Sequence, residues 1–176
     1  MVIEPQPPDP HWPRYSSHPF PPSRFVPGRS SHPRRHPSGY SYGRPEPLLL
    51  LPPPDQWRQS QDYLYGIDLM NFAYWWESHE VFEGLWHSAG HETEQGNFFR
   101  ALIHLAAANL KWVLNRPRAT HNLLRSGLIR LRRVPSNYMG VDVEGLVATL
   151  QNSRVEWRPP APLIALGMRK GPAAIP

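Results

Sequence analysis

Apolar residues recur at helical spacing along five stretches in the second and third quarters of the chain and just beyond. The third stretch is apolar on most sides, which is typical of a helix at the centre of a bundle. No stretch alternates apolar and polar residues as a strand does, and no internal repeat is present. We therefore expect an all-α fold, a compact bundle of about five helices. The spacing predicts helices over residues 56–70, 74–89, 93–114, 117–134 and 141–152.

Residues that start or stop helices define the ends of these stretches. Asp55 follows three prolines and is a favourable N-cap for the first helix. Gly90 follows the second helix, where a glycine commonly ends one, and Pro117 suits the first turn of the fourth. These signals place the helical domain at residues 55–155.

Proline divides the rest of the chain, because 16 of its 23 prolines lie in residues 1–54. Proline interrupts both helices and sheet ladders, so this part is predicted to be a proline-rich arm. Six aromatic residues in the arm predict that it docks in part on the helices, while a disordered segment remains the alternative. Residues 156–176 are predicted to be a short proline-rich tail.

The composition limits the cellular setting of the protein. The chain has no cysteine, so disulfides, thiolate metal sites and a cysteine nucleophile are excluded. The longest aliphatic run, Leu48–Leu51, is too short to cross a bilayer, and the first ten residues do not resemble a secretory signal. We therefore expect a cytoplasmic protein without a membrane-spanning segment.

Charge is distributed unevenly along the chain. Asp55–Phe99 contains eight acidic residues and one basic residue, whereas Arg100–Arg133 contains eight basic residues and no acidic one. Arg118, Arg125 and Arg132 are predicted to form a stripe on the outer face of the fourth helix. Because the two halves can pair with each other inside one fold, the pattern does not favour nucleic acid as a partner. The proline-rich arm instead predicts a protein partner or a homo-oligomer.

The densest chemistry lies in the second predicted helix, where Glu77, His79, Glu80 and Glu83 fall within seven residues. At helical spacing, neighbouring members of this set lie three or four residues apart and can meet on the surface of the helix. His79 and Glu83 are predicted to lie at the edge of the apolar stripe, where they would be half-buried.

The string Glu77-x-His79-Glu80-x-x-Glu83-x-x-Trp86 resembles the most specific motif of the family known as domain of unknown function 309. Three later segments resemble that family in the same order: Phe98–Ala106, Asn115–Ala119 and Tyr138–Asp142. The resemblance covers roughly residues 55–166. It implies a compact all-helical domain with no established activity, and it implies a metal site at the motif only as a suggestion.

Two interpretations of the four-residue set remain open. In the first, the protein is a non-enzymatic structural or interaction module, and the carboxylates form a polar clamp between the second helix and the third or fourth. Part-buried carboxylates need donors, and the second half of the chain offers them. The expected donors are Arg100, Arg118, Arg125 and the Trp86 indole.

In the alternative, the protein binds a divalent metal ion through His79, Glu83, Glu80 and Glu77. A metal-dependent hydrolase is one form of this alternative. A second helix that contributes ligands is hard to find, because His104 shares a face with Arg100 and Lys111, which predicts a surface position. His87 would extend the set along the same helix. Either His32 or His36 of the arm would close over it. No nucleophile motif or phosphate loop is present, so whether the protein is an enzyme stays open.

Overall fold

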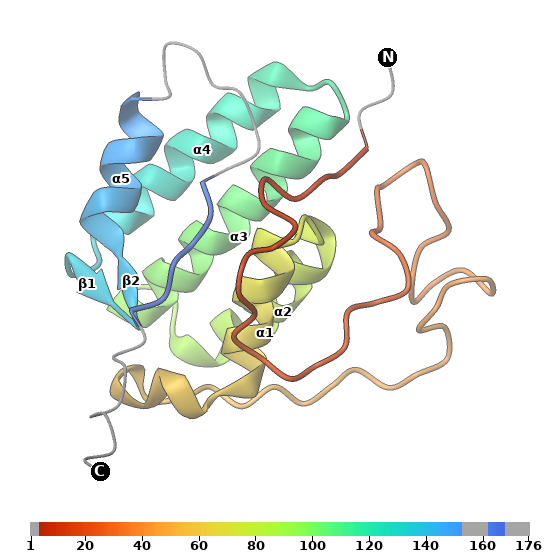
Figure 1. Cartoon of the computed structure of the whole chain (residues 1–176), viewed down its shortest axis with the longest axis horizontal. Coiled ribbons are helices and arrows are strands. Elements are labelled where there is room, and N and C mark those ends of the chain that lie inside the picture. The colour runs from red at the N-terminus through yellow and green to blue at the C-terminus, as the bar shows by residue number, and fades with distance from the viewer. Residues whose placement is uncertain (1–3, 153–161, 168–176) are drawn as a thin grey trace.

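The computed structural model describes residues 4–152 and 162–167 and contains the predicted helical bundle (Figure 1). The all-α prediction is confirmed, with one very small two-stranded sheet in addition. The elements in chain order are the 3-10 helix η1 (Pro54–Gln59), α1 (Gln61–Asn71), α2 (Trp75–Ala89), α3 (Glu94–Val113), α4 (Pro117–Leu131), β1 (Asn137–Tyr138), β2 (Val141–Asp142) and α5 (Val143–Asn152).

Helix α3 lies between α2 and α4, as its apolar sequence predicts (Figure 1). Burial of its side chains on several sides gives one continuous core, to which α1 and α5 also contribute. Burying a large apolar side chain stabilises a fold by about 1.5–3 kcal/mol, so this core is a major source of stability. The largest fully buried side chains include Tyr63, Phe82, Phe98, Phe99, Leu102 and Leu105.

Side-chain caps explain where two of the helices begin. The Thr93 hydroxyl accepts a hydrogen bond from the Gly96 amide at 2.9 Å, which caps α3 at the predicted residue. The Ser60 hydroxyl accepts one from the Tyr63 amide at 3.2 Å and caps α1.

The prediction that the first helix begins at residue 56, capped by Asp55, is therefore wrong. Residues 54–59 form the separate 3-10 helix η1, and Ser60 adopts an extended backbone that interrupts the helix before α1 begins. Three consecutive prolines fix the approach of the chain, and the tighter helix accommodates Pro54 in its first turn.

The hairpin β1–β2 was also missed, and it delays the fifth helix from residue 141 to Val143. Met139 and Gly140 both have a positive φ, of 46° and 81°, as the two central residues of a tight hairpin turn require. Strands of two residues are too short to show alternation, so the periodicity of the sequence carries no sign of them. α4 also ends at Leu131, three residues earlier than predicted.

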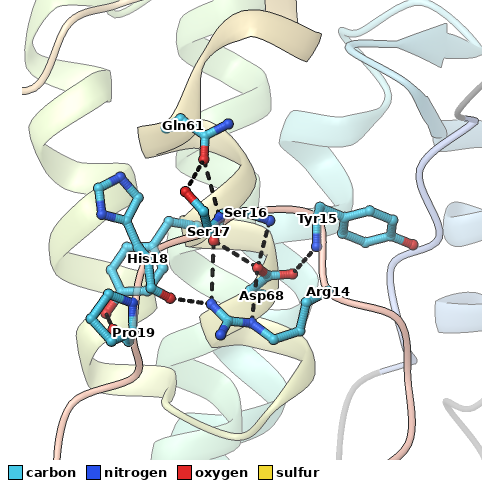
Figure 2. A network of polar contacts seen from close by, with 9 residues as sticks. Arg14, Tyr15, Ser16, Ser17, His18, Pro19, Gln61 and Asp68 are labelled. Atoms are coloured by element: carbon cyan, nitrogen blue, oxygen red, sulfur yellow. Dashed lines mark hydrogen bonds and ion pairs between the residues drawn. The ribbon is translucent and has the colours of Figure 1, made fainter.

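Residues 4–53 contain no helix or regular strand and run along α1 and α2 (Figure 1). The Asp68 side chain of α1 is fully buried and accepts hydrogen bonds from the amides of Tyr15 and Ser16 at 2.8 and 2.9 Å. It also accepts one from the Ser16 hydroxyl at 2.8 Å, and the Arg14 guanidinium lies 3.5 Å away (Figure 2). One carboxylate therefore satisfies two main-chain donors that belong to no helix or sheet.

The short C-terminal stretch 162–167 is held in a similar way. The buried Asn71 side chain donates to the Ile164 carbonyl at 2.9 Å and accepts from the Ile164 amide at 2.8 Å. Leu166 forms an isolated bridge with Val141 of the hairpin. Two polar side chains of α1, Asp68 and Asn71, thus anchor both the N-terminal segment and the C-terminal stretch.

We predict that Asp68→Ala lowers the free energy of unfolding by about 3 kcal/mol, because it leaves buried main-chain donors without an acceptor. Urea unfolding of purified protein measures this change. Asp55→Ala is the matched control, since Asp55 is exposed, and its effect should stay within about 0.5 kcal/mol. Equal losses in the two variants would contradict the anchoring role of Asp68.

Candidate functional site

The structure divides the four-residue set of α2 into two parts with different surroundings. Glu77 is buried and faces the N-terminal segment, whereas the other three side chains are half-buried. His79, Glu80 and Glu83 form a cluster whose ligand atoms all lie within 4.8 Å of one another. Glu77 is not a member of this cluster.

Glu77 acts as a second anchor for the N-terminal segment. Its Oε1 accepts hydrogen bonds from the Phe25 amide at 2.9 Å and from the Tyr40 hydroxyl at 2.8 Å. Burial raises the pKa of Glu77 above its ordinary value, and the hydrogen bonds from Phe25 and Tyr40 offset that rise only in part. Burial and the neighbouring Glu77 also raise the pKa of Tyr40, so this phenol stays protonated and donates.

The expected partners of the clamp are therefore wrong. Glu77 meets donors 37 and 52 residues earlier in the chain and not the arginines of the third and fourth helices. Arg118 and Arg125 are exposed. Arg100 lies over the ring of Trp86, with its guanidinium carbon 4.8 Å from the ring centroid.

The cluster of His79, Glu80 and Glu83 is held more loosely. His79 Nδ1 lies 3.5 Å from a carboxylate oxygen of Glu80 and 3.8 Å from one of Glu83. These separations are longer than a hydrogen bond, and the buried Nδ1 atom has no hydrogen-bond partner. The three groups therefore converge on one point without satisfying one another.

A cleft of about 280 Å³ opens beside the cluster, between α2, α3 and α4. Its polar lining comes from His79 and Glu83 of α2 and from Arg100 and His104 of α3. Its remaining lining residues are Trp86, Ile103, Ala107 and Leu123.

The surface position expected for His104 is wrong. Its side chain is half-buried and lines the cleft from α3, outside the group of three converging ligand atoms. Burial lowers the pKa of His104, the nearby charge of Arg100 lowers it further, and a main-chain hydrogen bond with Ser126 opposes both. The imidazole is therefore neutral at pH 7, as a metal ligand must be. Its buried Nδ1 has no hydrogen-bond partner.

The other histidines considered from the sequence lie elsewhere. His87 lines a neighbouring hollow of about 130 Å³ together with Glu80 and Glu83. His32 Nδ1 accepts hydrogen bonds from the amides of residues 34 and 35, and its ring packs on Trp76. His36 Nδ1 accepts from the Ser38 amide. The arm histidines thus serve their own turns and do not cover the cluster.

The arginine stripe of α4 is exposed at Arg118, Arg125 and Arg132, as predicted. Pairing between the acidic and basic halves is found beside the stripe. There Arg130 and Arg133 lie 3.4 and 3.1 Å from carboxylate oxygens of Glu92.

The arrangement defines a small helical-bundle protein with a histidine–carboxylate cluster at the mouth of a cleft. Residues 63–123 match a family model described as a domain of unknown function (DUF309). The match confirms the predicted resemblance over most of α1, all of α2 and α3, and the first half of α4, which carry the whole cleft. No curated protein matches the chain. In residues 4–152 and 162–167, no helix is both long and apolar enough to cross a membrane.

We predict that Glu77 makes stability depend on pH with a definite sign. Since the folded state holds this proton more tightly than the unfolded state, its contribution is fully present below about pH 4.5 and is lost as pH rises through the raised pKa. Glu77→Gln keeps an acceptor oxygen but cannot ionise. It should therefore match or exceed the unchanged protein in stability at pH 7, with a flatter pH profile.

Urea unfolding across pH 4–8 tests this prediction. Glu77→Ala should lose about 2–3 kcal/mol at pH 7, because the Phe25 amide and Tyr40 hydroxyl lose their acceptor. Glu144→Gln, at an exposed position of α5, serves as the control. An unchanged pH profile in Glu77→Gln would show that Glu77 does not carry this dependence.

Proposed function

We propose that the protein is a small binding module that holds one divalent metal ion at His79, Glu80 and Glu83, with His104 as a further ligand from α3. The convergence of three potential ligand atoms within 4.8 Å, beside an open cleft, carries this proposal. It favours the metal-binding alternative over a clamp for these three residues. Glu77 and Asp68 belong to the framework that positions α2.

The distances within the cluster support a shared ion. Zinc binds histidine nitrogen and carboxylate oxygen at about 2.0–2.2 Å, so two ligands of one tetrahedral ion lie about 3.4 Å apart. The separations of 3.5 and 3.8 Å from His79 Nδ1 to the two carboxylates are close to that spacing. A clamp would instead need a basic or donor group at hydrogen-bond distance from each carboxylate. Among the described residues, His79 is the one basic side chain within 4 Å of a carboxylate oxygen of Glu80 or Glu83.

The ligand set indicates the class of metal. One or two imidazoles with carboxylates suit Zn²⁺ and Mn²⁺, whereas an all-oxygen site would favour Mg²⁺ or Ca²⁺. A neutral His104 can bind without first losing a proton, which lowers the cost of binding at pH 7.

Metal-dependent hydrolysis is the second candidate, and the open cleft beside the cluster favours it. In that case His79, Glu83 and His104 would hold the ion, and Glu80 would serve as the base that activates water. Glu77 drops out of the set, because it lies outside the convergent cluster and its Oε1 accepts hydrogen bonds from the N-terminal segment. We also propose that the protein is cytoplasmic and that it binds a protein partner or a second copy of the chain.

We predict that chelator-treated protein binds one equivalent of Zn²⁺ or Mn²⁺ by isothermal titration calorimetry, and that His79→Ala binds neither. A metal at one hundred times its dissociation constant should stabilise the fold by about 2.7 kcal/mol, visible as a higher melting temperature. His121→Ala is the control, because His121 is an exposed histidine on α4. No saturable binding by the unchanged protein, or equal binding by His79→Ala, would contradict the proposal.

A further inference from the structure

We propose that the cleft beside the cluster binds a small molecule that carries one carboxylate on a compact apolar body, with Arg100 as the carboxylate-binding residue. The inference rests on the proposed function, because the metal ion supplies part of the attraction. It names the class of ligand that the metal-loaded cleft takes.

Arg100 is the first support for an anionic ligand. Its guanidinium lies over the Trp86 ring and not against a carboxylate, although Glu83 lines the same cleft. Stacking uses the face of a guanidinium and leaves the N–H groups at its edge available. Those groups match the two oxygens of a carboxylate, and Arg100 is the one arginine that lines the cleft.

The composition of the lining indicates the body of the ligand. The apolar part of the lining comes from Ile103 and Ala107 of α3, Leu123 of α4 and the Trp86 ring. Apolar walls with a few polar groups are typical of sites for small organic molecules. A cleft of about 280 Å³ lies just below the range for such sites, so it suits a compact ligand. A single arginine and this apolar wall favour a monocarboxylate over phosphate, which calls for more donors.

The charges of the cluster make the two binding events dependent on each other. Without a metal ion, the carboxylate of Glu83 in the cleft, and that of Glu80 in the neighbouring hollow, would repel an approaching carboxylate. A bound divalent cation offsets both negative charges and leaves Arg100 as the dominant charge facing the ligand. Carboxylate binding should therefore be strong with metal and weak without it, and by linkage the carboxylate should tighten metal binding by the same factor.

Benzoate, its neutral analogue benzamide, and inorganic phosphate are the probes for the test. Each is titrated into zinc-loaded and chelator-treated full-length protein, with the Trp86 indole N–H followed by NMR. We expect benzoate to saturate the zinc-loaded protein, to bind at least tenfold more weakly without zinc, and to outcompete both benzamide and phosphate. Arg100→Gln should weaken benzoate at least tenfold, whereas Arg118→Gln, at an exposed position of α4, should not change it.

A second variant keeps the test decisive if Arg100→Gln is unstable. Ala107→Leu narrows the apolar part of the cleft and should weaken benzoate while zinc still binds. The zinc titration is made first without any carboxylate, so a failure there counts against the metal site itself. The inference is overturned if zinc binds normally but benzoate does not saturate the protein, or if Arg100→Gln binds benzoate equally well. It is also overturned if phosphate binds more tightly than benzoate, or if benzoate binds equally well with and without zinc.

Discussion

The rest of the structure depends on one kind of interaction. Two buried carboxylates accept hydrogen bonds from main-chain amides of the N-terminal segment. Asp68 of α1 holds residues 15 and 16, and Glu77 of α2 holds Phe25 together with the Tyr40 hydroxyl. A proline-rich segment cannot satisfy its own main-chain donors by forming a helix or a sheet. The buried acceptors therefore do for this segment what a neighbouring strand would do in a sheet.

This anchoring also determines which part of α2 is free for other chemistry. Glu77 faces the N-terminal segment, so His79 and Glu83 are left to line the cleft, and Glu80 lines the neighbouring hollow with Glu83. The cleft exists because α3 presents Arg100 and His104 toward Trp86 at one end of their shared face. Further along that face, Lys111 is exposed. The same face of α3 therefore lines the cleft at Arg100 and is exposed to solvent at Lys111, about three turns later.

Much of the fold follows from local patterns in the sequence, whereas the long-range contacts do not. The apolar periodicity was sufficient to place α3, because it acts within a few residues. The same local signals identified His79, Glu80 and Glu83 as one cluster. They could not reveal that Glu77 would accept a hydrogen bond from an amide 52 residues away. Nor could they reveal that His104 would line a cleft together with Trp86 and Leu123. Burial of a polar side chain depends on which segment packs over it, and no spacing within one helix records that.

The central claim is that one ion lies between His79 and its two carboxylate neighbours while Glu77 stays with the N-terminal segment. Anomalous diffraction at the zinc edge, from crystals of the full chain grown with zinc, tests it most directly. The account predicts one peak about 2.0–2.2 Å from a His79 ring nitrogen and from oxygens of Glu80 or Glu83, with Glu77 still bound to the Phe25 amide. A peak centred on His87 or on Glu77, or no ordered peak at the cluster, would contradict it.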